Sequence, residues 1–201
     1  MRIAGIILAG GEGARIGGGK ALRPFGGASL IDAVIARVKD QVDTLALNIS
    51  SGEVDVYRAR YANGCPLIPD AFAAGTGPLA GVVAGMEWAN TLAGIEWLAT
   101  FPCDTPFLPG DLVKRLVEAS KPGRPVAAED GERLHGVCAI WPVSCLPRLR
   151  AGVEQGQLRS LFSALEVLNG TRCRFDDAEA FFNVNTTADL ERAEAIAASR
   201  G

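Results

Sequence analysis

The sequence predicts a single three-layer α/β/α domain of Rossmann-like type, built on a mostly parallel sheet. Short apolar runs that suit strands alternate with stretches of helical periodicity through residue 120, the order that joins parallel strands by helical crossovers. The first run, residues 3–9, is almost wholly apolar, as expected of a strand buried on both faces. No repeat or linker-like segment divides the 201 residues, so we expect one domain over residues 1–201.

The elements after the first strand follow in order. Ser29 can cap a helix over residues 29–39, where apolar residues recur at helical spacing. Apolar runs predict the next strands, at 44–49, 66–68 and 95–101. Between them we expect a helix of about ten residues from Glu53 and an apolar helix over 79–92, whose first turn Pro78 suits.

The second half of the chain has a less regular pattern. Two further strands, 125–129 and 134–141, are expected to pair antiparallel around Asp130-Gly131. The helices expected there are 111–119, a stretch after Pro142, 158–168 and a final helix from Thr187.

The loop after the first strand is rich in glycine and carries two cations, Arg15 and Lys20. Six of the eleven residues from 10 to 20 are glycine, which suggests a backbone that approaches a ligand closely. Bare N–H groups beside an arginine and a lysine suit phosphate oxygens. The loop is not a P-loop, because Ala14 stands where a glycine is needed and Ala21 follows the lysine. The dinucleotide pattern fails as well, at Ile16.

The segment Leu8-Ala9-Gly10-Gly11, followed by Arg15, Gly17-Gly18 and Lys20, resembles the signature of nucleotidyltransferases. It is most similar to that of the molybdenum cofactor guanylyltransferases. That family usually has an aspartate just before the lysine, and Gly18-Gly19-Lys20 is one residue short there.

Two later loops extend the resemblance. Asp70, followed by Gly77-Pro78-Leu79 and Gly81, is similar to the pattern of the same family, and Pro102-Cys103-Asp104-Thr105-Pro106 is the most specific short match. Three prolines between 102 and 109 restrain the backbone around Asp104. Magnesium is commonly held by one or two carboxylates together with substrate phosphates, so we expect Mg²⁺ at Asp104.

The resemblance implies transfer of GMP from GTP to the terminal phosphate of molybdenum-bound molybdopterin, with release of pyrophosphate. It implies catalytic roles for Arg15, Lys20 and Asp104. The expected GTP-binding residues are Leu8, Ala9, Gly10, Gly11, Lys20, Asn48, Asp70 and Asp104. Other proteins of molybdenum cofactor biosynthesis are expected as partners.

Near the C-terminus, Asn183 and Asn185 alternate and would face one side of an extended segment. The resemblance places them beside the pterin substrate. They could instead cap the last helix, a reading that the neighbouring Thr186 supports. His135 is the only histidine, and its role stays open. We expect Cys103 to pack in the core without a chemical role.

The composition of the chain excludes some classes of binding partner. A net charge of −3 argues against general binding of nucleic acid or acidic membranes. No apolar run approaches 18 residues, and five cysteines show no C-x-x-C spacing, as expected of reduced thiols in a cytoplasmic protein. We expect a monomer.

The sequence leaves three alternative functions open. They are a molybdopterin cytidylyltransferase, a sugar-phosphate nucleotidyltransferase and a nucleotide-binding regulator without turnover. Gly10 and Thr105 favour the guanylyltransferase over the cytidylyltransferase.

Overall fold

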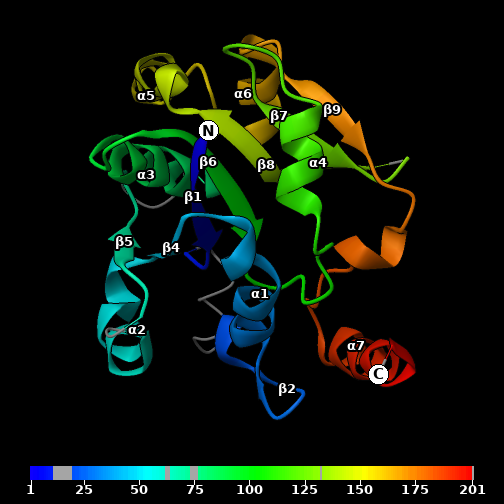
Figure 1. Cartoon of the computed structure of the whole chain (residues 1–201). Coiled ribbons are helices and arrows are strands. Elements are labelled where there is room, and N and C mark those ends of the chain that lie inside the picture. Colours follow the sequence, from blue (N-terminus) through cyan, green and yellow to red (C-terminus); the bar gives the residue numbers. More distant parts are fainter. Residues whose placement is uncertain (11–19, 62–63, 73–76, 132, 201) are drawn as a thin grey trace.

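The structure, a computed structural model, describes residues 1–10, 20–61, 64–72, 77–131 and 133–200 (Figure 1). A seven-stranded sheet has the order β5-β4-β1-β6-β8-β7-β9. Its strands are β1 (Arg2–Leu8), β4 (Thr44–Ile49), β5 (Leu67–Pro69), β6 (Ile95–Pro102), β7 (Val126–Glu129), β8 (Leu134–Pro142) and β9 (Thr171–Arg174). In this sheet β8 pairs antiparallel with both neighbours, and every other pairing is parallel. The prediction of a mostly parallel sheet is therefore confirmed.

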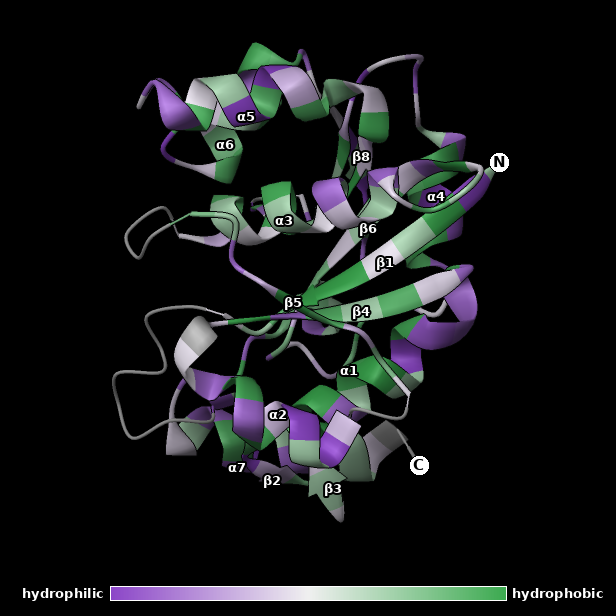
Figure 2. Cartoon of the chain, turned by 90° about the vertical axis from the view of Figure 1, so that its left-hand side faces the viewer, coloured by the Kyte–Doolittle hydropathy of each residue, from purple (hydrophilic) through white to green (hydrophobic). Residues whose placement is uncertain are grey.

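Helices cover both faces of the sheet. The α-helices are α1 (Leu30–Val38), α2 (Val54–Tyr61), α3 (Pro78–Asn90), α4 (Leu112–Glu118), α5 (Leu146–Glu154), α6 (Leu161–Val167) and α7 (Thr187–Arg200). One apolar core joins the sheet to α1, α2 and α4, and a second joins it to α3, α5 and α6. This is the expected three-layer arrangement, with the apolar strands β1 and β4 between layers of helices in Figure 2.

The alternation of β1 shows why it lies at the centre. Ile3 and Ile7 belong to one core, whereas Ala4, Ile6 and Leu8 belong to the other. A strand with apolar side chains in both directions is stable only where both faces are covered. Its neighbours β4 and β6 satisfy its backbone groups on both edges.

Short 3₁₀ helices complete the connections. They are Lys20–Leu22, Lys39–Gln41, Ser51–Glu53, Val143–Cys145 and Ala178–Phe181. The predicted cap at Ser29 is present as a capping box, in which the Asp32 carboxylate accepts a hydrogen bond from the Ser29 backbone N–H at 3.0 Å.

A third apolar cluster lies beside the main sheet. Here α7 packs against the two-stranded hairpin of β2 (Pro24–Phe25) and β3 (Ala28–Ser29) (Figure 1). This hairpin and β9 were not predicted from the sequence, because two to four residues are too few for a visible alternation. Some predicted bounds also differ from those in the structure; the helix predicted over 158–168 begins only at Leu161. Within the described residues, no helix combines the length and apolar character needed to cross a membrane.

Candidate active site

The chain reverses direction across the sheet next to β1. From β1 it passes through α1 to β4 and then β5, and it returns through α3 to place β6 on the other side of β1. In open α/β sheets the crevice beyond the carboxyl ends of the strands, at such a reversal, is where ligands bind. The carboxyl ends of β1 and β6 carry Leu8–Gly10 and Pro102–Asp104. The fold therefore brings Gly10, where the glycine-rich segment begins, and Asp104 to the same edge of the sheet.

Gly10 is packed against the backbone that follows β4. The N–H groups of Ala9 and Gly10 both donate to the carbonyl oxygen of Asn48, at 2.9 and 3.0 Å. A Cβ atom on Gly10 would lie 3.0 Å from the Ser50 nitrogen and 3.1 Å from the Ile49 carbonyl carbon. Because these neighbours are backbone atoms, only glycine fits this approach without a shift.

Asn48, which is buried, and Asp70, which is half-buried, form a hydrogen-bonded pair next to Gly10. The Asn48 side-chain nitrogen donates to Asp70 at 2.9 Å and to the Ile68 carbonyl at 3.2 Å. Burial raises the pKa of the Asp70 carboxyl, and the hydrogen bond from Asn48 opposes that rise. A Cβ atom on Gly81 would lie 2.3 Å from the Asn48 side-chain oxygen, so Gly81 makes room for this pair.

Lys20 links Asp104 to the C-terminal segment. Its ammonium group contacts both the Asp104 carboxylate and the side-chain oxygen of Asn185. The Val184 N–H donates to the Asp104 carbonyl at 2.9 Å. Residues that are 80 or more positions apart in the sequence therefore meet around one carboxylate.

Asn183 is held next to Asp104 as well. Its side-chain oxygen accepts a hydrogen bond from the Thr105 hydroxyl at 2.5 Å. Val184 is fully buried between two exposed asparagines, so Asn183 and Asn185 face the same side, as their alternation requires. The cap of α7 is formed by Thr186, whose hydroxyl accepts from the Asp189 N–H at 3.1 Å. Helix capping is thus assigned to residues other than the two asparagines.

A cleft of about 510 Å³ lies at these strand ends. Leu8, Gly10, Asp104 and Asn183 line it, together with Pro78, Pro102, Val137 and Arg159. Asn48 contacts the lining residue Gly10 through its backbone carbonyl, and its side chain is hydrogen-bonded to Asp70. Lys20 contacts the carboxylate of the lining residue Asp104. The predicted residues Gly11 and Arg15 lie outside the described residues.

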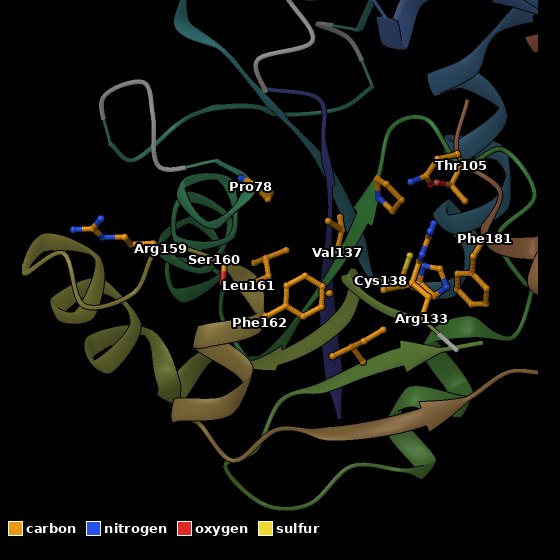
Figure 3. Close-up of a pocket in the computed structure, with 15 residues that line it drawn as sticks. Pro78, Thr105, Arg133, Val137, Cys138, Arg159, Ser160, Leu161, Phe162 and Phe181 are labelled. Atoms are coloured by element: carbon orange, nitrogen blue, oxygen red, sulfur yellow. The ribbon is translucent and has the colours of Figure 1, made fainter. Parts of the chain in front are cut away.

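A second cavity, of about 290 Å³, adjoins the cleft (Figure 3). The two share a lining of Pro78, Pro102, Val137, Arg159 and Asn183. Because β8 runs antiparallel to β6, its first residues lie beside the carboxyl end of β6 and form the floor of this cavity. Sequence reasoning missed its lining residues Arg133, Val137, Arg159, Phe162 and Phe181, since the neighbour of β6 depends on strand order.

Two further side chains near the site are the Cys103 thiol and the His135 imidazole. Burial raises the pKa of the Cys103 thiol to about 12, and the nearby Asp104 charge adds to the rise, so the thiol is protonated at neutral pH. This agrees with a packing role. His135 stacks on Phe181, with ring centroids 4.4 Å apart and an interplanar angle of 14°. Its Nε2 lies 3.0 Å from Asp130 Oδ2, an ion pair when the imidazole is protonated.

The described residues contain no group of three or more acidic, histidine or cysteine side chains arranged for a metal. Asp104 nevertheless fits a magnesium ion that takes most of its ligands from a bound nucleotide. Its carboxylate lines the cleft and already attracts the Lys20 cation. A single carboxylate of this kind needs the phosphates of a substrate to complete the coordination.

Residues 5–168 match the family described as MobA-like NTP transferase domain. A molybdenum cofactor guanylyltransferase of Cereibacter sphaeroides is 42% identical over 199 residues, covering 98% of this chain and 97% of that protein. One of Yersinia pestis (strain Pestoides F) is 38% identical over 191 residues, covering 94% of this chain and 93% of that protein. The crystal structure of molybdopterin-guanine dinucleotide biosynthesis protein A from Archaeoglobus fulgidus superposes with a TM-score of 0.78 at 24% identity, covering 98% of this chain and 99% of that one.

Proposed function

The chain belongs to the family of MobA-like NTP transferase domains, and from this membership we propose that it transfers GMP from GTP to molybdenum-bound molybdopterin. The product is the molybdopterin guanine dinucleotide cofactor, and pyrophosphate leaves. The observation that carries the proposal is the cleft at the strand reversal, where Gly10, Asp104 and Asn183 meet. The guanylyltransferase names of the similar proteins favour GTP over CTP as donor.

The chemistry requires two polyanions to be held together and in line. A phosphate oxygen of the acceptor forms a bond to the α-phosphorus of GTP, and the bond from that phosphorus to the bridging oxygen breaks. The electron pair leaves with pyrophosphate. Positioning and charge stabilisation account for most of the catalysis of such transfers, and the attacking phosphate is already largely ionised near neutral pH. A general base is therefore unnecessary.

The roles of the residues follow from their positions. Leu8 and Gly10 line the part of the cleft in which the guanine lies, with Ala9 between them in the chain and Asn48 and Asp70 next to Gly10. Lys20 is close to Asp104 and stabilises charge on the departing phosphates. When bound at Asp104, Mg²⁺ supplies charge neutralisation at the α-phosphate. We assign Arg15 the same electrostatic role as Lys20, on the family pattern alone.

A pyrophosphate-release assay tests this proposal. Release from GTP should require the pterin acceptor and Mg²⁺, and CTP and ATP should be poor donors, because a pocket that hydrogen-bonds one base rejects another by as much as ~10⁴-fold. Equal rates with GTP and CTP would instead support a cytidylyltransferase, and transfer to a sugar phosphate would support the sugar nucleotidyltransferase. Tight GTP binding without release would support a regulator.

A further inference from the structure

We propose that the second cavity binds the acceptor, with its fused heterocycle between the His135–Phe181 stack and Phe162 and with an anionic group on Arg133. The proposal rests on the function proposed above, and it assigns acceptor recognition to residues outside the nucleotide cleft. Four features of the cavity support it: its continuity with the cleft, its aromatic walls, its available cation and its size.

The second cavity is continuous with the nucleotide cleft. The two cavities share Pro102 and Asn183, and Asp104 follows Pro102 by two residues. A molecule in the second cavity can therefore extend a phosphate toward Asp104, where the bond to the α-phosphorus must form. Its volume of about 290 Å³ is at the lower end of ordinary ligand pockets, which suits one fused ring system.

The walls suit a flat aromatic ligand. Figure 3 shows Phe181, Arg133 and Thr105 on one side of the cavity, and Leu161 and Phe162 on the other. Phe181 is only 4% exposed and packs edge-on against Phe175, so this wall is rigid. By contrast Phe162 is 54% exposed, a large apolar surface that a bound ring would cover.

Arg133 provides a cation without an internal partner. Some exposed arginines of the described chain are ion-paired, such as Arg150 with Glu154 at 2.9 Å and Arg172 with Glu129 at 2.9 Å. For the Arg133 guanidinium, the described residues provide no hydrogen bond or ion pair, while its backbone N–H donates to Asp130. A guanidinium in this situation suits a phosphate or another anionic group of the acceptor.

Arg133 and Arg159 differ in a way that the experiment can use. Arg159 lines both cavities, whereas Arg133 lines only the second. Loss of the Arg133 charge should therefore affect the acceptor and leave the nucleotide alone. His135 acts as a positioning residue in this scheme, because its ring supports Phe181, two residues before Asn183.

The test compares Arg133→Gln and Phe162→Ala with the control Arg148→Gln in the full chain. Arg148 is an exposed arginine of α5 outside both cavities. Arg133→Gln should raise the KM for molybdopterin about tenfold or more, the scale of a lost charge-assisted hydrogen bond. Phe162→Ala should raise it about tenfold because an aromatic contact is lost, and GTP affinity by calorimetry should stay within about twofold of wild type in both variants. Arg133→Lys should recover part of the loss, and the control should behave as wild type.

A second measurement separates this proposal from the proposed function. The anisotropy of a fluorescent pterin phosphate monoester reports direct binding without any transfer. Binding to the wild type that Arg133→Gln weakens and GTP does not displace would support the acceptor site, even if transfer of GMP failed. An unchanged KM and unchanged pterin binding in both test variants would overturn the proposal. So would an equal loss of GTP affinity, which would place Arg133 in the nucleotide site.

Discussion

The Lys20 ammonium group contacts the Asp104 carboxylate, although 84 residues separate them in the sequence. The pair forms because β6 lies beside β1, and Asp104, just past the end of β6, is close to the 3₁₀ helix that begins at Lys20. It lines the cleft with a carboxylate and places a cation next to it, the two charges that a magnesium–triphosphate complex needs.

Substituting Asp104→Asn should reduce Mg²⁺-dependent transfer of GMP at least about a hundredfold, because the amide cannot replace the charge that holds the metal. The melting temperature should stay close to wild type, since the side chain is not part of an apolar core. Transfer rates across a Mg²⁺ titration measure the effect. Asp111→Asn is the matched control, an exposed aspartate whose side chain makes no cap hydrogen bond. Transfer near the wild-type rate in Asp104→Asn would contradict the metal assignment.

Substituting Lys20→Met should weaken the binding of GTP more than that of GMP. The lysine is expected at the β- and γ-phosphates, which GMP lacks, and one charge-assisted hydrogen bond changes affinity about tenfold or more. Calorimetry with both nucleotides measures the difference, and Lys20→Arg should retain part of the GTP affinity. Equal losses for the two nucleotides would place Lys20 at the α-phosphate or the nucleoside.

The double substitution of Asn183 and Asn185 to alanine should lower GMP transfer strongly while GTP affinity stays within about threefold of wild type. The melting temperature should change little, because Thr186 and Asp189 form the cap of α7. Asp189→Ala is the contrast, and its lost cap should cost about 1 kcal/mol of unfolding free energy. A double variant that melts like Asp189→Ala and transfers GMP normally would return the asparagines to a capping role.

Substituting Gly81→Ala should lower both stability and GTP affinity. The added methyl group would lie 2.3 Å from the Asn48 side-chain oxygen and must displace a buried residue, an overpacking that costs about 1–3 kcal/mol. Chemical denaturation and nucleotide titration measure the two effects. Gly110→Ala is the control, because its Cβ would meet nothing within 4 Å. A Gly81→Ala protein with normal GTP affinity would show that Asn48 is not part of the nucleotide site.

Asp32 should make the stability depend on acid pH. Burial raises the pKa of its carboxyl, but hydrogen bonds from Ser29 and Tyr61 and the charge of Arg60 lower it by more, and the net pKa is below its ordinary value. A carboxyl with a depressed folded pKa adds stability above its unfolded value of about 3.9 and loses it as the pH falls toward the folded pKa. Unfolding free energies from about pH 5 to about pH 2.5 should therefore fall more steeply in wild type than in Asp32→Asn. Asp55→Asn, at a side chain 97% exposed, should leave the slope unchanged.

The parallel half of the fold was predictable because its signals are local. These signals each act within a few residues: the apolar run of β1, the capping box at Ser29 and Pro78 in the first turn of α3. The same holds for the antiparallel pair of β7 and β8, whose turn at Asp130-Gly131 is visible in the sequence. The short strand β9 and the β2–β3 hairpin were missed, since each is held by its neighbours and not by its own pattern.

The sequence by itself determined the chemistry of the nucleotide side: a glycine loop after a buried strand, a lysine, and an aspartate held between prolines. Only the tertiary structure decided which residues from the second half of the chain lie at the cleft. The place of β8 beside β6 sets Val137 and Arg133 next to the cleft, and the path of the C-terminal segment sets Asn183 and Asn185 at Asp104 and Lys20. The physical reason is that residue type and spacing determine local conformation, whereas strand order and close approach depend on how distant apolar faces bury one another.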